Sequence, residues 1–223
     1  MEILRTENLE KIYLDDGVPV HALRGINLTI DKGDYLVIAG PSGSGKTTLL
    51  NLLGTLDKPT KGKIFFDNQD ITEKKKKELS DFRLHKFGFI FQAYNLIPVL
   101  SALENIEFNM MLLGIPEKER RNKALGLMDE LGIKELADKR PNDMSGGQQQ
   151  RVAAVRAIVN DPVVVLADEP TANLDSKTGD VLLDMMQRMN KEKNITFVFS
   201  SHDEQVMNRA ERLLILKDGL IEN

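Results

Sequence analysis

One short stretch of the chain combines residue types at the spacing that phosphate binding requires. From Gly40 to Thr47 it reads Gly-Pro-Ser-Gly-Ser-Gly-Lys-Thr, which fits the pattern G-x-x-x-x-G-K-[ST]. Glycines let the backbone curl so that successive N–H groups point at one anion, and a helix that follows adds its positive N-terminal end. We therefore predict a nucleoside triphosphate site formed by Gly40, Pro41, Ser42, Gly43, Ser44, Gly45, Lys46, Thr47 and Thr48.

Two side chains of this loop have distinct expected roles. Lys46 would reach the β- and γ-phosphates, and the Thr47 hydroxyl would be a ligand of Mg²⁺. An apolar run at 35–39 precedes the loop, and a good helix-forming sequence at 48–53 follows it. The alternative is a glycine-rich turn before an ordinary helix. It is disfavoured because the lysine, the hydroxyl and both flanks are all in place.

A pair of adjacent carboxylates ends a second apolar run. Residues 163–167 read Val-Val-Val-Leu-Ala, as in a fully buried strand, and Asp168 and Glu169 follow directly. Beside a phosphate loop, an acidic residue at such a strand end is the usual second holder of Mg²⁺. We expect Asp168 to bind the metal and Glu169 to take a proton from an attacking water. The alternative is that both carboxylates only cap the next turn.

A second segment has the features of an anion-binding helix terminus. Ser145 and Gln148 have the spacing of a capping box, and Gly146 and Gly147 lie between them, before an amphipathic helix. Glycines in a first turn cost helix propensity, about 1 kcal/mol each. What they offer is bare backbone N–H groups that an anion can approach. A well-capped helix without any ligand is the alternative.

Polar side chains follow two further expected strands. Gln92 comes after the run 87–91, and His202 comes shortly after the run 194–199. A lone histidine is usually only a surface or core residue. In open α/β sheets, however, ligands bind at the edge where the carboxyl ends of the strands meet. We therefore expect Gln92, Asp168 and His202 to lie near one another.

The elements that must position these residues indicate an α/β fold. Short β-like runs at 3–6 and 18–23 flank the turn 15–17, and Tyr13 just before it is a base-stacking candidate or a plain strand residue. Helix signals dominate from about residue 93. We predict a single domain: a P-loop NTPase core with a mostly parallel sheet flanked by helices, an N-terminal antiparallel β part and an inserted helical lobe. The core comprises 1–92 and 161–223, and the lobe 93–160.

Composition excludes several other classes of protein. The 223 residues are 41% hydrophobic and 29% charged, as in an ordinary globular protein, and they include no cysteine for disulfides or thiolate metal sites. A formal net charge of −4 gives no case for nucleic acid as a partner. No signal peptide and no apolar run of bilayer-spanning length is visible. We expect an intracellular protein that is not itself inserted into a membrane.

The order of these elements resembles that of ATP-binding cassette (ABC) transporter ATPase subunits, over essentially the whole chain. Within that family the chain is most similar to the lipoprotein-release and macrolide-export type, through residues 20–23, 50–54, 103–105, 148–151 and 173–179. Met144, Ala172 and Ser201 stand where leucine, glycine and threonine are usual. None of these differences removes a reacting group.

The resemblance implies roles for individual residues. Tyr13 would stack on adenine, and Gln92 would contact Mg²⁺ and the attacking water. Ser145 to Gln148 would form the signature motif, Asp175 would belong to a loop that crosses to another subunit, and His202 would hydrogen-bond the γ-phosphate. The nucleotide would be ATP with Mg²⁺. Glu169, His202, Gln92 and Lys46 would be the catalytic residues.

The resemblance also implies an assembly. A metal-free anion site is redundant unless it closes over a nucleotide held by another copy, so we expect a homodimer with two ATP molecules between the subunits. A groove at about 93–115 would receive a cytoplasmic helix of a membrane permease, which would hold the chain on the cytoplasmic face of the cell membrane. The alternatives are an ABC ATPase of a non-transporting, mechanotransmission complex and a soluble ABC ATPase. Cargo and direction of transport depend on the partner.

Overall fold

The structure, a computed structural model, describes residues 1–222. Its strands are β1 (Glu2–Asp15), β2 (Val18–Asp31), β3 (Tyr35–Ala39), β4 (Lys61–Phe66), β5 (Gln69–Asp70), β6 (Phe87–Ile90), β7 (Val164–Asp168), β8 (Thr196–Ser200), β9 (Arg212–Lys217) and β10 (Leu220–Glu222). Its α-helices are α1 (Lys46–Leu53), α2 (Lys76–Lys86), α3 (Ala102–Leu112), α4 (Glu117–Glu130), α5 (Gly146–Ile158), α6 (Ser176–Lys193) and α7 (Glu204–Asn208). Single 3₁₀ turns lie at Lys134–Leu136 and Pro141–Asp143.

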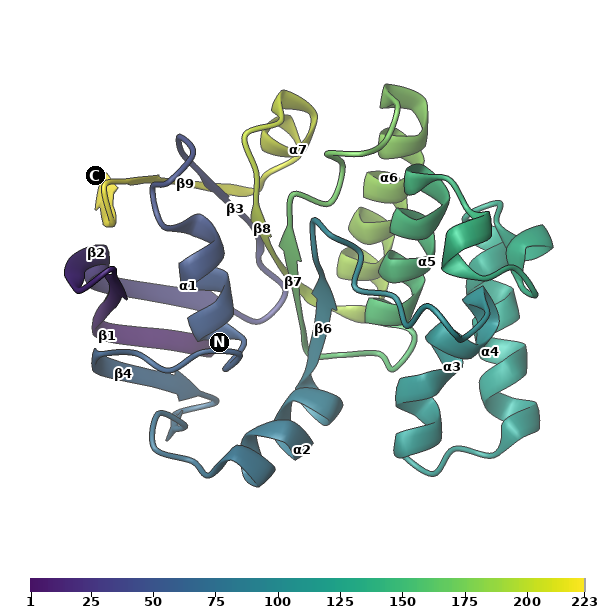
Figure 1. The fold of residues 1–223 in the computed structure, drawn as a ribbon, viewed down its shortest axis with the longest axis horizontal. Coiled ribbons are helices and arrows are strands. Elements are labelled where there is room, and N and C mark those ends of the chain that lie inside the picture. The colour runs from purple at the N-terminus through teal and green to yellow at the C-terminus, as the bar shows by residue number, and fades with distance from the viewer. Residues whose placement is uncertain (223) are drawn as a thin grey trace.

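A six-stranded sheet crosses the middle of the molecule in the order β10-β9-β3-β8-β7-β6 (Figure 1). Strands β9, β3, β8, β7 and β6 are parallel, and β10 pairs antiparallel with β9. Because both faces are covered, β3, β7 and β8 are buried almost throughout and read as continuous apolar runs. Their carboxyl ends meet at one edge of the sheet. At this edge the phosphate loop follows β3, and Asp168 is the last residue of β7.

The two faces of this sheet pack against different layers. Leu36 and Ile38 of β3 belong to a core shared with α1 and the N-terminal strands. Tyr35 and Val37, on the opposite face, belong to a core shared with helices α3 to α6. This alternation is the period-2 geometry of a strand. Helix α1, which follows the phosphate loop, is thereby fixed between two sheets.

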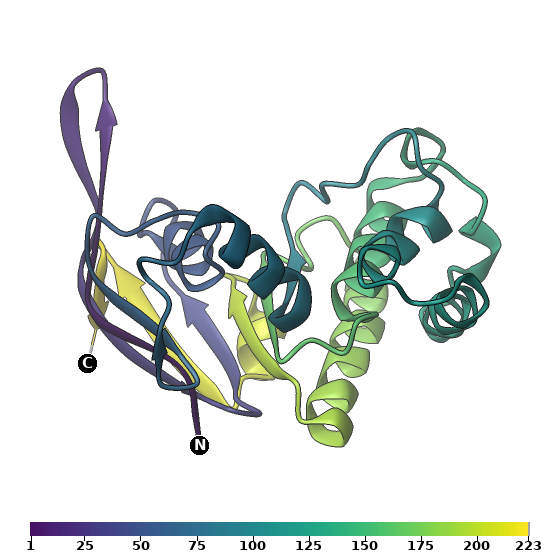
Figure 2. The same cartoon turned by 90° about the horizontal axis from the view of Figure 1, so that it is seen from below.

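The second sheet is antiparallel, in the order β2-β1-β4-β5. The turn between β1 and β2 has positive φ at both Asp16 (46°) and Gly17 (82°), as a type I′ hairpin requires. Figure 2 shows the far end of this hairpin projecting away from the rest of the molecule. Tyr13, which pairs with Val20, lies on the projecting part.

Helices α3, α4 and α5 pack together on the other side of the central sheet (Figure 1). The predicted capping box of α5 is present, since the Ser145 side chain accepts from the Gln148 N–H, and α3 begins with another, in which Ser101 accepts from the Glu104 N–H. None of the helices in residues 1–222 combines the length and the apolar character needed to cross a bilayer.

The predicted fold class is confirmed, and the differences from it are local. Strands β1 and β2 each span 14 residues and are longer than the predicted runs 3–6 and 18–23. The predicted runs were too short because register shifts interrupt the alternation of apolar and polar residues along both strands. Helix α6 occupies 176–193, where no element was predicted. Helices α3 to α5 all fall within 93–160, the range assigned to the lobe.

Candidate functional site

The phosphate loop lies between β3 and α1 and depends on glycine at two close approaches. A Cβ on Gly40 would lie 2.0 Å from the Leu216 carbonyl oxygen, and one on Gly45 would lie 2.5 Å from the carbonyl oxygen of Ala22. Gly45 also has φ of 103°, in the region that glycine adopts without strain. The loop conformation therefore requires glycine at both positions.

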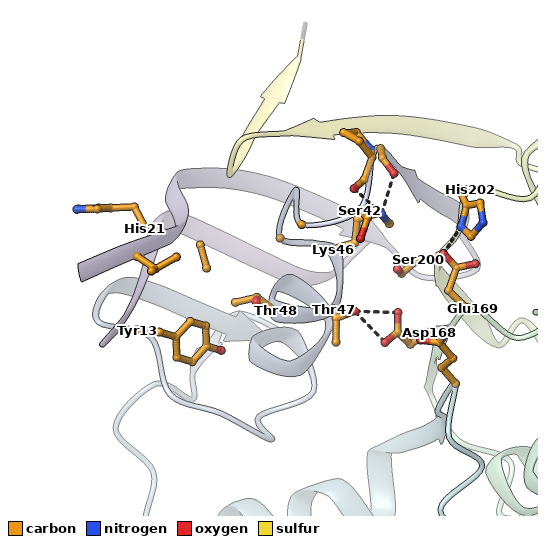
Figure 3. A pocket seen from close by; sticks show the side chains of 17 residues that line it. Tyr13, His21, Ser42, Lys46, Thr47, Thr48, Asp168, Glu169, Ser200 and His202 are labelled. Carbon is orange, nitrogen blue, oxygen red and sulfur yellow. Dashed lines mark hydrogen bonds and ion pairs between the residues drawn. The ribbon is translucent and has the colours of Figure 1, made fainter. Parts of the chain in front are cut away.

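Lys46 and Thr47 begin α1, and Figure 3 shows the Lys46 side chain directed into the loop and the Thr47 side chain directed at Asp168. The Lys46 Nζ donates to the carbonyl oxygens of Gly40 (2.7 Å) and Pro41 (3.0 Å), so the ammonium group is held inside the loop. The Thr47 hydroxyl faces the end of β7, where it lies 2.9 and 3.2 Å from the two carboxylate oxygens of Asp168. Two of the three predicted metal ligands, Thr47 and Asp168, are therefore neighbours.

This pair of side chains fits Mg²⁺. A hydroxyl oxygen and a carboxylate converge, and both are hard oxygen donors of the kind that Mg²⁺ prefers. In residues 1–222 there is no cluster of three or more His, Cys, Asp or Glu that could enclose a metal ion. Mg²⁺ does not need such a cluster, because it is usually held by one or two carboxylates together with substrate phosphates.

Glu169 is fixed by two hydrogen bonds at the end of β7. Its Oε2 accepts from the buried Ser201 hydroxyl at 3.0 Å, and its Oε1 lies 2.6 Å from Nδ1 of His202. The backbone at Glu169 has φ of 47°, a strained value for a residue with a side chain. Strain of this kind persists only where the surrounding structure imposes it, and here it turns the carboxylate toward the loop that carries His202.

The predicted residues converge on one cavity of about 570 Å³. Figure 3 shows Tyr13 at one end of it, Asp168, Glu169 and His202 at the other, and Lys46, Thr47 and Thr48 between them. Gln92 also lines the cavity. The lining residues that were predicted are Tyr13, Gly40, Pro41, Ser42, Gly43, Gly45, Lys46, Thr47, Thr48, Gln92, Asp168, Glu169 and His202.

Several other predicted residues do not line this cavity in the described part of the chain. Ser44 is buried behind the loop, at 2% exposure. Ser145, Gly146, Gly147 and Gln148 begin α5, and Asp175 caps α6 by accepting from the Thr178 N–H at 3.0 Å. Their predicted roles in nucleotide binding stay predictions.

Some residues of the site were not predicted from the sequence. Val20, His21, Ala22 and Ser200 also line the cavity, and Ser201 holds Glu169 from behind. The hairpin register places Val20 beside Tyr13, and a pattern of residue types does not reveal that register. Position was the signal that could have identified Ser200 and Ser201 as site residues: they follow the predicted strand 194–199 and directly precede His202.

A second groove lies between β6, α3 and α5. It encloses about 260 Å³, and its apolar residues include Phe87, Phe89, Phe91, Ile97 and Phe108. Arg156 of α5 borders it and donates to the carbonyl oxygens of Tyr94 (2.7 Å) and Asn95. Burial lowers the pKa of Arg156 to about 10, which still leaves the guanidinium charged at neutral pH. The loop after Gln92 is therefore attached to α5.

A phosphate loop with its lysine, an acidic strand end facing the loop threonine and a bordering carboxylate define a P-loop nucleoside triphosphatase. A family model described as "ABC transporter" matches residues 23–172. The chain is 43% identical over 221 residues to an uncharacterised ABC transporter ATP-binding protein of Thermotoga maritima, covering 99% of this chain and 94% of that one. This chain belongs to the ABC transporter family and is one of its ATPases.

Other relatives carry more specific names. A lipoprotein-releasing system ATP-binding protein LolD of Syntrophus aciditrophicus is 39% identical, with 98% of both chains covered. A macrolide export ATP-binding/permease protein MacB of Syntrophobacter fumaroxidans is 41% identical over the whole chain, which spans 31% of that longer protein. The solved dimeric cassette MJ0796, whose sequence is from Methanocaldococcus jannaschii, superposes with a TM-score of 0.95 at 41% identity, covering 99% of this chain and 97% of that one. A second structure of MJ0796, in a post-hydrolysis state with ADP and Pi, has the same TM-score.

Proposed function

We propose that the chain hydrolyses ATP as a homodimer that encloses two Mg²⁺–ATP and drives a membrane permease of the lipoprotein-release or macrolide-export type. The observation that carries the proposal is the separation of two anion-binding elements in one chain. The cavity has a lysine, a pair of metal ligands and a carboxylate, whereas the Gly146-Gly147 helix terminus lies outside it. The names of the relatives LolD and MacB support the subtype.

Within one subunit, each group has a defined task. Lys46 binds the β- and γ-phosphates, and the adjacent loop N–H groups bind the remaining phosphate oxygens. Thr47, Asp168 and Gln92 would hold Mg²⁺, which when bound neutralises charge on the phosphates. Tyr13 stacks on the base at the opposite end of the cavity.

Glu169 is the general base. Its carboxylate borders the cavity and is fixed by the Ser201 hydroxyl, so that it can accept a proton from a water aimed at the γ-phosphate. Because Nδ1 of His202 contacts Glu169, the other ring nitrogen is the one that can face the γ-phosphate. Catalysis then consists of positioning and charge stabilisation, as in other phosphoryl transfers.

The dimer follows from the helix terminus of α5. Its first turn presents the N–H groups of two glycines, and the capping box leaves those of Gly146 and Gly147 available to an anion. In the proposed homodimer this terminus and Asp175 close over the γ-phosphate held by the partner subunit. ATP therefore joins the subunits, and hydrolysis removes the bridging group, so the subunits separate.

The permease would dock in the groove beneath the Gln92 loop. An amphipathic helix presents an apolar face, and the aromatic side chains Phe87, Phe89, Phe91 and Phe108 offer a complementary surface. Arg156 attaches the loop of residues 94 and 95 to α5. Occupation of the groove can in this way affect Gln92 and the helix that begins with the signature motif.

The variant Glu169→Gln tests the proposal. It should keep ATP affinity, reduce turnover by about 10²–10⁴-fold, and accumulate as a dimer in ATP, because binding persists while the bridge is no longer hydrolysed. Size-exclusion chromatography with light scattering, with and without ATP, measures the dimer. Glu192→Gln, which changes an exposed carboxylate near the end of α6, is the matched control and should behave as the parent chain. A Glu169→Gln chain that stays monomeric in saturating ATP contradicts the homodimer.

A further inference from the structure

The Tyr13 side chain is tied to residues outside the nucleotide cavity. Its hydroxyl donates to Oδ2 of Asp57 at 2.9 Å, and the ammonium group of Lys11 lies 2.8 Å from the same oxygen. The Lys11 Nζ also lies 4.8 Å from the centroid of the Tyr13 ring, within the range of a cation–π contact. Tyr13 lines the cavity, whereas Lys11 and Asp57 are not among its lining residues.

Lys11 and Asp57 are themselves anchored to the segment that follows α1. The Lys11 Nζ donates to the Lys58 carbonyl oxygen at 2.7 Å, and Oδ1 of Asp57 accepts from the Lys58 N–H at 2.7 Å. The Asp57 N–H donates in turn to the carbonyl oxygen of Asn51 within α1. The phosphate loop precedes this helix and the Tyr13 anchor follows it, so one rigid element sets the positions of both.

The protonation states favour this arrangement. Burial alone would raise the pKa of Asp57, but hydrogen bonds from Lys11, the Lys58 N–H and Tyr13 outweigh it and hold that pKa below its ordinary value. Burial raises the pKa of Tyr13, and the hydrogen bond to Asp57 raises it further. At neutral pH the phenol therefore keeps its proton and donates it to an ionised carboxylate.

Tyr13 needs such an anchor because of its place in the fold. The hairpin around it projects from the molecule (Figure 2), and its neighbours Leu14 and Val18 are 76% and 63% exposed. Little packing therefore holds the ring, and a mobile ring would have to be immobilised each time a base stacked on it. Lys11 lies over the ring but does not line the cavity, so a base that enters the cavity can contact Tyr13 without displacing Lys11.

We infer that Lys11 and Asp57 are positioning residues that hold the Tyr13 ring as a preformed platform for the base of the nucleotide. The inference rests on the proposed function, in which Tyr13 stacks on adenine. It adds that affinity for the base depends on an ion pair that does not touch the nucleotide. Affinity for the phosphates does not depend on it.

The test compares two ligands, ATP and inorganic triphosphate, by isothermal titration calorimetry on the full chain. Asp57→Ala should weaken ATP binding by about 2- to 12-fold, the range for immobilising one side chain on binding. Affinity for inorganic triphosphate should stay unchanged, which also shows that the phosphate loop is folded. Asp57→Asn keeps an acceptor for the Tyr13 hydroxyl and should lie between the parent and Asp57→Ala. Lys11→Met should weaken ATP binding in the same selective way.

A double substitution separates positioning from a general effect on the hairpin. In a Tyr13→Phe background the hydroxyl is absent and only the contact of Lys11 with the ring remains, so Asp57→Ala should cause a smaller loss of ATP affinity than in the parent chain. Asp15→Ala removes an exposed carboxylate from the same hairpin and is the matched control; it should leave both affinities unchanged. An equal loss of affinity for ATP and triphosphate in Asp57→Ala would overturn the inference.

Failure of the inference is distinguishable from failure of the proposed function. Tyr13→Ala should lower ATP affinity by about 5- to 150-fold, the range expected for one stacked base, with triphosphate binding retained. If Tyr13→Ala has this effect and Asp57→Ala has none, Tyr13 stacks on the base without help, and the inference is wrong. If neither variant changes the ratio of the two affinities, Tyr13 does not bind the base, and that part of the proposed function fails.

Discussion

Replacing Gly147 by alanine separates the stability of the fold from the function of the dimer. Gly147 lies in the first turn of α5, where alanine is a better helix former by up to about 1 kcal/mol. A Cβ at this position would lie 3.2 Å from Cδ2 of Leu174 and 3.5 Å from the Asn173 carbonyl oxygen. The flexible Leu174 side chain can move by the few tenths of an ångström required. The substitution should therefore leave the free energy of unfolding unchanged or raise it by up to about 1 kcal/mol.

The same methyl group should damage catalysis if the proposed homodimer forms, because there the γ-phosphate held by the partner subunit approaches the first turn of α5. Loss of one oriented N–H donor in a reaction site costs about 10²–10³-fold in turnover. We expect a decrease of that order in steady-state ATPase activity. ATP affinity measured at protein concentrations too low for dimerisation should stay the same, because Gly147 does not line the cavity of its own subunit.

Urea unfolding, ATP binding and ATPase activity of Gly147→Ala together distinguish an effect on stability from an effect on the dimer. Gly126→Ala in α4 is the control, since that glycine is exposed and a Cβ added to it would have no other atom within 4 Å. It should stabilise the fold by about 1 kcal/mol and leave turnover unchanged. Full ATPase activity in Gly147→Ala would refute the role assigned to the α5 terminus. A large loss of stability would refute the packing argument.

Three further variants test other parts of the site. Lys46→Ala should abolish triphosphate binding in calorimetry, and unchanged affinity would exclude the phosphate loop as the site. Ser201→Ala removes a hydrogen bond to Glu169 and should cost about 1–3 kcal/mol in urea unfolding, with lower turnover and unchanged ATP affinity; equal turnover would show that Glu169 needs no such support. Burial raises the pKa of Glu107 in spite of Arg120, so the folded state binds this proton more tightly than the unfolded state. The stability contributed by the protonated carboxyl is therefore lost as pH rises through the raised pKa. In Glu107→Gln the urea midpoint should fall less steeply with pH over this range. The same slope in the variant and in the parent chain would contradict the raised pKa.

Local patterns predicted the parts of the site that are made by neighbours in sequence. The phosphate loop needs glycines, a lysine and a hydroxyl within eight positions, and both capping boxes need a serine and an acid or amide three residues apart. Each of these structures is closed by hydrogen bonds over a few residues. Residue type and spacing therefore carry the whole signal, and the structure reproduces them.

Other parts depend on contacts between distant segments. Glu169 and His202 were predicted as residues that follow two separate strands, and the hydrogen bonds that join Glu169 to Ser201 and His202 become visible only when β7 and β8 are paired. Helix α6 was not predicted, although its apolar residues form a stripe that packs on the central sheet. The residues of β3 that share its core, Tyr35 and Val37, are remote in sequence, and burial in that core stabilises the helix.

Residue types at fixed local spacings were enough to predict a triphosphate site, a metal and a carboxylate base from the sequence. Which of the candidate residues share a cavity could be seen only in the folded chain. The fold places the α5 terminus outside that cavity and connects Tyr13 to Asp57 across 44 positions. Strand register and the packing of α1 between two sheets depend on many contacts between distant segments. They bring distant residues together, but neither segment alone has a sequence pattern that predicts the contact.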